Sequence, residues 1–200
     1  INDINEDVIN IYCSIRNRYD KFKKRLNELE AKYIPLSKED RKKYYFEVRH
    51  EHGWNYEKWS RSEEAATLYF LMKTGFNGIY QLNKNTNGRY GTPAGLLNQK
   101  DKVYDRDVLD WWHNVLQRTT IYSADYREVI QDKDTFHFFD PPYRDSFADY
   151  GTGFNDNDLL DLIEICDGMK NVFLCNRDGG DGFFDSNKSG LNIARFPVTY

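Results

Sequence analysis

Residues 135–143, which read TFHFFDPPY, decide the fold. The β-prone run at 135–139 ends at two prolines, and a short apolar run bounded in this way predicts a buried strand. Farther along the chain, residues 156–167 have helical spacing, and residues 171–175 (NVFLC) predict a second buried strand. This strand-helix-strand order predicts an α/β fold with a mostly parallel sheet covered by helices.

The tetrapeptide Asp140-Pro141-Pro142-Tyr143 follows the first of these strands, at the edge where ligands bind in open α/β sheets. The prolines fix φ and keep the preceding residues extended, so the Asp140 carboxylate and the Pro141 carbonyl can face one pocket as acceptors. Two acceptors suit an exocyclic amino group, and the Tyr143 ring can stack on the base that carries it. All four residues are candidate catalytic residues. The alternative for an isolated Asp-Pro-Pro is a rigid turn.

The first two thirds of the chain predict helices and one hairpin. Residues 7–32 have the spacing of a single amphipathic helix, capped by Asp3 or Asn5 and ended by Pro35. Further helices are expected at 62–74, with Ser62 as the cap, and at 107–117. Between them, residues 75–95 are dense in Asn, Gly and Thr, which predicts a hairpin with its turn at residues 87–88. Residues 119–123 and 191–200 have the composition of strands.

Composition excludes several classes of protein. Among the 200 residues, 28 basic and 32 acidic side chains give a net charge of −4, which argues against a protein that coats DNA by charge alone. No run of about 18 apolar residues is present, so no membrane span is expected. The three cysteines are far apart and fit a reducing cytoplasm. In residues 50–52 (HEH) the two histidines face apart on a helix, so we expect a surface segment and no metal site.

The sequence resembles the Dam-type adenine-specific DNA methyltransferases, which carry Asp-Pro-Pro-Tyr as their catalytic motif. Residues 2–5 (NDIN) are similar to the family's segment after the second strand, whose acid binds the cofactor ribose. Residues 123–126 (SADY) match the segment whose acid lies near the cofactor adenine. Residues 75–78 (GFNG) and 92–95 (TPAG) resemble the two ends of the DNA-reading hairpin. The resemblance implies cofactor contacts from Asp3, Asp125, Tyr126 and Asp140.

This resemblance implies a DNA adenine N6-methyltransferase that uses S-adenosylmethionine and flips its target base out of duplex DNA. Its catalytic domain would be a Rossmann-like sheet formed by residues 1–35 and 117–200, interrupted at 36–116 by a helical target-recognition domain. Double-stranded DNA is the expected partner, no metal is required, and we expect a monomer. The expected DNA-contacting residues are Lys73, Phe76, Asn77, Gly78, Tyr80, Gln81, Asn83, Lys84, Arg89 and Pro93.

One hairpin position departs from the family pattern. Dam-type enzymes that methylate GATC usually carry an arginine two residues before the asparagine matched by Asn83, and here that position is Gln81. Arginine pairs with the two acceptors of guanine, whereas glutamine matches the N6 and N7 of adenine. We therefore expect a target that contains adenine but is not strictly GATC. A contact from Lys84 or Arg89, or a register shifted by one residue, is the alternative.

Two other functions stay open at this point. One is methylation of RNA or of a protein amide, because related motifs orient any planar amine. The other is a catalytically dead DNA-binding subunit, because the glycine-rich cofactor turn expected about 20 residues before Asp3 is not in the sequence. Since residues 1–10 have neither a methionine nor the regions of a signal peptide, we expect an interior piece of a larger chain, cut at both ends.

Overall fold

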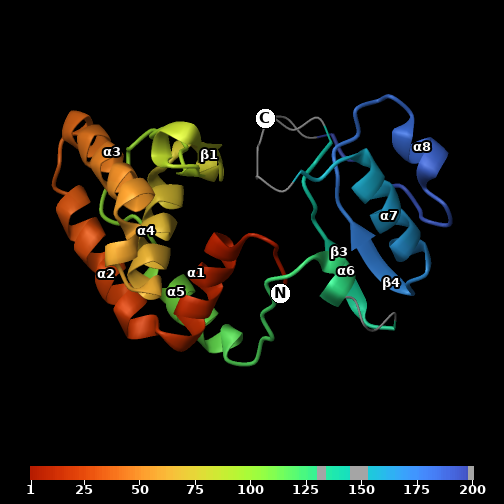
Figure 1. The fold of residues 1–200 in the computed structure, drawn as a ribbon, viewed down its shortest axis with the longest axis horizontal. Helices are drawn as coiled ribbons and strands as arrows, with labels where there is room; N and C mark the ends of the chain where they lie inside the picture. Colours follow the sequence, from red (N-terminus) through yellow and green to blue (C-terminus); the bar gives the residue numbers. More distant parts are fainter. Residues whose placement is uncertain (130–133, 145–152, 198–200) are drawn as a thin grey trace. The chain divides into compact units, whose positions relative to one another are not determined.

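The computed structural model describes residues 1–129, 134–144 and 153–197 (Figure 1). The chain divides into two compact units, residues 1–129 and 130–200, and each is described by itself. Together they form a mixed α/β protein with small sheets. Among the described residues, no helix is both long and apolar enough to cross a membrane.

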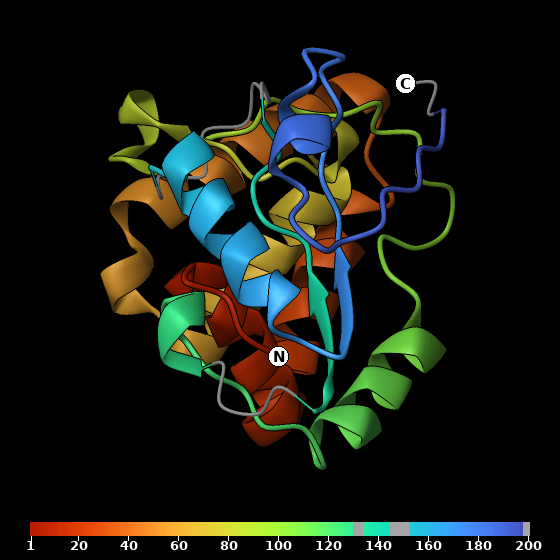
Figure 2. The ribbon, with the colours of Figure 1, turned by 90° about the vertical axis from the view of Figure 1, so that its right-hand side faces the viewer.

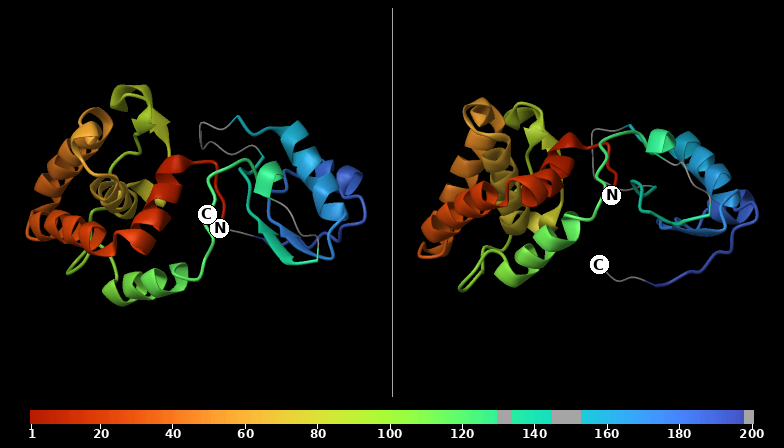
Figure 3. Two further views of the ribbon diagram at one scale, coloured as in Figure 1. Left: turned by 60° about the horizontal axis from the view of Figure 1, so that its bottom comes forward. Right: turned by 90° about the horizontal axis from the view of Figure 1, so that it is seen from below.

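Helices make up most of the first unit. The longest elements are α1 (Glu6–Asn17), α2 (Tyr19–Tyr33), α3 (Lys38–Trp54), α4 (Arg61–Thr74) and α5 (Arg106–Leu116). Short helical turns are η1 (Tyr56–Lys58), η2 (Phe76–Gly78), η3 (Lys84–Thr86) and α6 (Tyr126–Val129). Helix α4 is the centre of the unit, because α1, α2 and α3 all pack against it (Figure 3).

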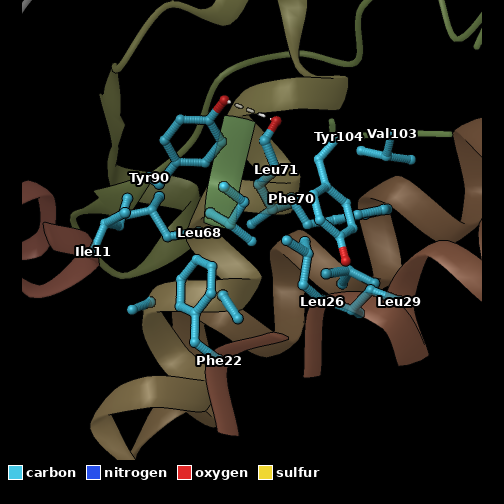
Figure 4. Packing of buried hydrophobic residues seen from close by; sticks show 14 of the residues in the cluster. Ile11, Phe22, Leu26, Leu29, Leu68, Phe70, Leu71, Tyr90, Val103 and Tyr104 are labelled. Atoms are coloured by element: carbon cyan, nitrogen blue, oxygen red, sulfur yellow. Dashed lines mark hydrogen bonds between the residues drawn. The ribbon is translucent and has the colours of Figure 1, made fainter. Parts of the chain in front are cut away.

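The core of this unit lies where α2 meets α4 (Figure 4). Phe22 and Leu26 on α2 and Leu71 on α4 have no exposed surface. The Tyr90 hydroxyl reaches the same core and donates a hydrogen bond to the Leu71 carbonyl at 3.3 Å. Tyr90 belongs to the hairpin, so the hairpin is part of the hydrophobic core of the first unit.

The predicted single helix at 7–32 is wrong, because the chain bends at Arg18 (φ −140°, ψ 36°) between α1 and α2. The bend lets both helices bury a face against α4. Asn5 caps α1, as one of the two alternatives predicted, and α2 ends at Tyr33, before Pro35. The predicted cap of α4 was two residues late: Ser60 caps the helix in a reciprocal capping box with Glu63.

The predicted hairpin is present. Strands β1 (Leu82–Asn83) and β2 (Arg89–Tyr90) pair antiparallel, and the turn uses Asn87 (φ 56°) and Gly88 (φ 72°) in the left-handed conformation that these residue types tolerate. Residues 119–123 are not a strand. Within them only Tyr122 pairs, in a single parallel bridge to Asn2. The described part of the segment at 191–200 also contains no strand.

The second unit is the predicted strand-helix-strand unit. Strand β3 (Phe136–Phe139) and strand β4 (Asn171–Leu174) pair in parallel, and α7 (Asp156–Asp167) lies between them in sequence and packs beside β4 (Figure 2). The prediction that both strands are buried is wrong: side chains alternate along β3 and β4 between exposed and half-buried, and Phe136, Phe138 and Phe173 are more than 60% exposed. The alternation follows because successive side chains of a strand point to opposite faces of the sheet. A short helix, α8 (Phe183–Asn187), follows the loop after β4.

The predicted domain boundaries stay a prediction. Residues 1–35 supply α1 and α2, which share one compact unit with residues 36–116. The expectation that the histidine pair lies on the surface is half wrong: His50 is exposed, but His52 is fully buried. Helix α3 explains the difference, since positions two apart on a helix face apart and His52 faces the packed side.

Candidate functional site

Asp140 directly follows β3, at the carboxyl end of the parallel pair. Pairing continues beyond the strands, because the Cys175 N–H donates to the Phe139 carbonyl at 2.9 Å. Asp140 is exposed, and its carboxylate has no hydrogen bond or salt bridge to any described residue. Burial and, secondarily, the negative charge of Asp140 raise the pKa of the Cys175 thiol. Within the described residues, the strand end therefore presents a carboxylate that no other side chain bonds.

Arg144 directly follows the tetrapeptide Asp140–Tyr143, and the sequence did not predict it as a site residue. Its backbone N–H donates to Asn176 Oδ1 at 3.0 Å, across from the end of β4. Its guanidinium donates to both carboxylate oxygens of Asp156, at 2.9 and 3.0 Å, and forms a salt bridge with Asp181 at 3.0 Å. The guanidinium also lies 3.9 Å from the centre of the Phe183 ring. A basic residue beside the catalytic motif was the available sequence signal.

Two of the predicted cofactor residues lie at neighbouring chain segments of the first unit. Asn2 pairs in parallel with Tyr122, and the Asn2 side chain bonds both backbone groups of Ala124, at 3.0 and 3.2 Å. Asp3 and Asp125 each follow directly, so the pairing places both acids at the same end of the two segments. Tyr126 begins α6 next to them.

The carboxylates of Asp3 and Asp125 differ in the hydrogen bonds and ion pairs that they make within the protein. Asp3 Oδ1 accepts the Asn5 N–H at 2.8 Å, and no described residue bonds its other oxygen. Asp125 accepts the Arg127 N–H at 2.9 Å and pairs with the Arg127 guanidinium at 3.2 Å. Asp3 thus keeps one carboxylate oxygen for hydroxyl donors.

The hairpin is fixed at its base by contacts that leave little room. Arg49 on α3 donates to the carbonyls of Gly91 and Thr92, both at 2.9 Å, and the Tyr45 hydroxyl donates to Thr92 at 2.8 Å. A Cβ on Gly91 would collide with the Asn83 side chain. Only glycine fits at position 91. The hydrogen bonds from Tyr45 and Arg49 hold the backbone of the hairpin base against α3.

The predicted DNA-contacting residues separate into two groups. Tyr80 is 8% exposed, and its hydroxyl donates to Asp7 on α1 at 3.1 Å. Arg89 is also engaged inside the protein, and Asn83 is half-buried. The remaining seven predicted residues are exposed on and around the hairpin: Lys73, Phe76, Asn77, Gly78, Gln81, Lys84 and Pro93.

A buried junction connects the hairpin with α1 and α4. The Arg89 guanidinium bonds the carboxylates of Asp7, at 3.3 Å, and Glu64, and it stacks 3.7 Å from the centre of the Tyr56 ring. The Glu64 side chain is only 5% exposed. Desolvation, with a smaller effect of the nearby Arg89 charge, lowers the pKa of His52 to about 4. The junction therefore holds a permanent cation beside a neutral imidazole.

Among the described residues, no group of three or more His, Cys, Asp or Glu side chains is arranged to hold a metal ion. Within the described part of the chain, His52 has no hydrogen-bond partner at either ring nitrogen. The charges that act on its ring are the Arg89 cation and, to a smaller extent, the Asp7 carboxylate.

Comparison with known proteins gives a consistent result. Residues 1–179 match the D12 class N6 adenine-specific DNA methyltransferase family. The chain is 32% identical to the type II methyltransferase M.MjaIII of Methanocaldococcus jannaschii, over 82% of this chain and 59% of that protein. It is 27% identical to M1.LlaDCHI of Lactococcus lactis subsp. cremoris, over 100% of this chain and 71% of that protein. It is 30% identical to M.CviBI of Paramecium bursaria Chlorella virus NC1A, over 76% and 53%.

The chain thus spans 59% of the length of M.MjaIII and 53% of that of M.CviBI. The family match covers the paired segments that carry Asp3 and Asp125, the hairpin, and the Asp140 tetrapeptide. The chain belongs to the D12 class N6 adenine-specific DNA methyltransferase family.

Proposed function

We propose that the protein containing this chain transfers a methyl group from S-adenosylmethionine to N6 of adenine in double-stranded DNA, in the manner of the Dam-type enzymes. The observation that carries this proposal is the Asp140 carboxylate, exposed at the end of β3 without a partner among the described residues. It stands in an Asp-Pro-Pro-Tyr motif within a chain of the D12 class family.

The chemistry asks little more of the protein than positioning. S-adenosylmethionine, when bound, supplies an activated methyl group. The Asp140 carboxylate and the Pro141 carbonyl would accept the two hydrogens of the adenine amine, which turns the nitrogen lone pair out of the ring plane. Tyr143 would stack on the base after it has left the helix. A carboxylate without a partner among the described residues supports this role, because a neutralising partner would compete with the amine.

Asp3, Asp125 and Tyr126 fit a nucleoside. The Asp3 oxygen that no described residue bonds is an acceptor for ribose hydroxyls, and Tyr126 begins α6 directly after Asp125, with the Arg127 guanidinium over its ring. We assign these three residues of the first unit to the cofactor. Asp125 would act while keeping its contact to Arg127.

The exposed hairpin residues are assigned to DNA. Lys73 and Lys84 suit phosphates, Gln81 suits a base edge, and Phe76, which is 49% exposed, suits insertion into the stack that the flipped base leaves. Tyr80 and Arg89 would support the hairpin from inside. This differs from the surface role expected for them, because both are engaged with Asp7.

We also propose that β3 and β4 belong to a Rossmann-like methyltransferase sheet and that residues 36–116 form the target-recognition insertion. Parallel strands joined by a helix support the first statement. An exposed hairpin anchored on α3 and α4 supports the second, since such a surface can enter a DNA groove.

Replacing Asp140 by Ala in the full-length protein tests the function. Loss of one of two charge-stabilising acceptors should lower single-turnover methylation of adenine by at least about 10²-fold. Asp134→Ala is a matched control, because Asp134 precedes β3 at its other end. Methylation by Asp140→Ala at the rate of this control would contradict the mechanism.

The same protein distinguishes the alternative functions. RNA and a protein amide should give no product under conditions where duplex DNA is methylated. Calorimetric titration with S-adenosylmethionine separates an enzyme from a catalytically dead DNA-binding subunit, which would bind DNA but not the cofactor.

A further inference from the structure

The two prolines of the catalytic tetrapeptide leave its position to be fixed by other residues. Proline has no N–H, so neither Pro141 nor Pro142 can donate a backbone hydrogen bond to the neighbouring strand. The prolines stiffen the segment, but stiffness alone does not place the Asp140 carboxylate. A contact just outside the motif has to fix the segment against the rest of the unit.

Arg144 provides that contact in two ways. Its backbone N–H bonds Asn176 Oδ1, which also accepts the Arg177 N–H at 2.8 Å. Its guanidinium donates two hydrogen bonds to the Asp156 carboxylate and forms a salt bridge with Asp181. The end of the catalytic segment is therefore tied to the first residue of α7 and to the loop after β4.

Charge attraction holds the Arg144 guanidinium between the carboxylates of Asp156 and Asp181. The guanidinium side chain is 12% exposed, and it lowers the pKa of Asp156; it also contributes to the lowered pKa of Asp181, where the Phe183 N–H is the larger cause. A planar fork that binds a carboxylate through two bonds has a defined orientation, unlike the point charge of a lysine. These contacts fix the orientation of the Arg144 side chain, and through it the position of the adjoining Asp140–Tyr143 segment.

We propose that Arg144 is a positioning residue for methyl transfer: it fixes the Asp140–Tyr143 segment so that the carboxylate and the tyrosine ring meet the flipped adenine in a productive geometry. This inference rests on the proposed function. A contact of Arg144 with a DNA phosphate is the competing role, and the occupation of its guanidinium by two carboxylates argues against it.

A matched pair of variants tests the role. Arg195 also bridges two carboxylates, Asp178 and Asp185, in the same unit, but no contact joins it to residues 140–144 within the described residues. Arg144→Ala and Arg195→Ala therefore each remove an arginine that pairs with two carboxylates, and only Arg144, whose side chain is 12% exposed against 47% for Arg195, adjoins the catalytic segment. Both are made in the full-length protein and assayed well below their melting temperatures.

Arg144→Ala should lower kcat about 10- to 100-fold, because a small misplacement of a catalytic group costs this much, while KM for DNA changes less than about threefold. Arg195→Ala should keep kcat within about threefold of the wild type. Arg144→Lys should fall between the wild type and Arg144→Ala, since lysine restores charge but not the fork.

A second variant reaches the same segment without touching the arginine. Asn176→Ala removes the acceptor of the Arg144 N–H and should also lower kcat at nearly constant KM. Asn176→Asp keeps the Oδ1 acceptor, but it replaces the buried Nδ2, which has no hydrogen-bond partner among the described residues, by a second oxygen and adds a negative charge beside the Arg144 cation. It should keep more activity than Asn176→Ala.

The outcomes separate clearly. Equal kcat for Arg144→Ala and Arg195→Ala would overturn the positioning role. A rise in KM or Kd for DNA at unchanged kcat would assign Arg144 to the phosphate backbone and overturn it as well. Absence of adenine methylation by the wild-type protein would contradict the proposed function itself, before any variant is compared.

Discussion

Replacement of Arg89 by Met tests whether the hairpin is anchored by a buried ion pair. The substitution keeps an unbranched apolar stem that can lie on Tyr56, but it removes the cation between Asp7 and Glu64. Side-chain exposures of 16% for Arg89 and 5% for Glu64 place the pair out of water. Removing one partner of a buried pair costs about 3–5 kcal/mol, because the other charge is left uncompensated.

The structure favours the lower end of that range. Glu64 retains Arg61 at 3.2 Å, and Asp7 retains the Tyr80 hydroxyl. We therefore expect Arg89→Met to lower the free energy of unfolding by about 3 kcal/mol. Arg106→Met is the control: Arg106 is 48% exposed, and the carboxylate of its partner Glu30 keeps the backbone N–H groups of Val103 and Tyr104 as donors, so the loss of Arg106 should cost about 1 kcal/mol or less.

Urea denaturation followed by tryptophan fluorescence measures both variants. All four tryptophans of this chain lie between residues 54 and 112, so the signal reports the first unit. If Arg89→Met unfolds at the same free energy as Arg106→Met, the junction does not anchor the hairpin. A hairpin freed in this way should also discriminate less between target and near-target DNA, which competition methylation measures directly.

Three further predictions concern the cofactor, the target and pH. Asp3→Ala should weaken S-adenosylmethionine binding about 10-fold or more, with little change in Kd for DNA. Asp3→Asn keeps the acceptor for the Asn5 N–H. If calorimetry finds no loss of S-adenosylmethionine affinity in either variant, Asp3 is a turn residue only. Gln81→Arg should shift the methylated sequence toward guanine at one position, by about 1–3 kcal/mol, and a strict GATC pattern in the wild type would refute this assignment. Because the pKa of His52 is lowered in the folded protein, the unfolded chain takes up the proton at a higher pH than the folded one. The free energy of unfolding is therefore highest above about pH 6.5, and it should decline by up to about 3 kcal/mol as the pH falls to about 4. His52→Phe should reduce this slope in denaturation experiments, and the exposed His50→Phe should not.

Short-range patterns predicted the strands and the helix around the Asp140 tetrapeptide. The strand before Asp140, helix α7 and strand β4 follow from runs of five to twelve residues with turn residues between them. The hairpin turn at Asn87 and Gly88 is likewise local, because left-handed backbone requires such residues. In these places local propensity and the final packing agree.

Long-range contacts could not be predicted in the same way. The bend at Arg18 depends on how α1 and α2 share the surface of α4, and the apolar spacing continues through it. Arg89 looked like a DNA contact because its carboxylate partners are 25 and 82 residues away in sequence. Arg144 needs Asp156, Asp181 and Asn176 to be brought to it by the fold. Charged residues are the least predictable, since sequence does not show whether they face water or another charge.

The construction of the hairpin divides it into a part that cannot change and a part that can. Gly91 and the buried side chains at the base tolerate almost no substitution, whereas Gln81 and Lys84 are exposed and exchange at little cost to folding. Under the proposed function, new target sequences can therefore arise in evolution by single substitutions at these exposed positions, without loss of the folded protein in between. A library randomised at the exposed positions and selected by resistance to restriction should be rich in folded variants, and the same library at the buried positions should be mostly unfolded.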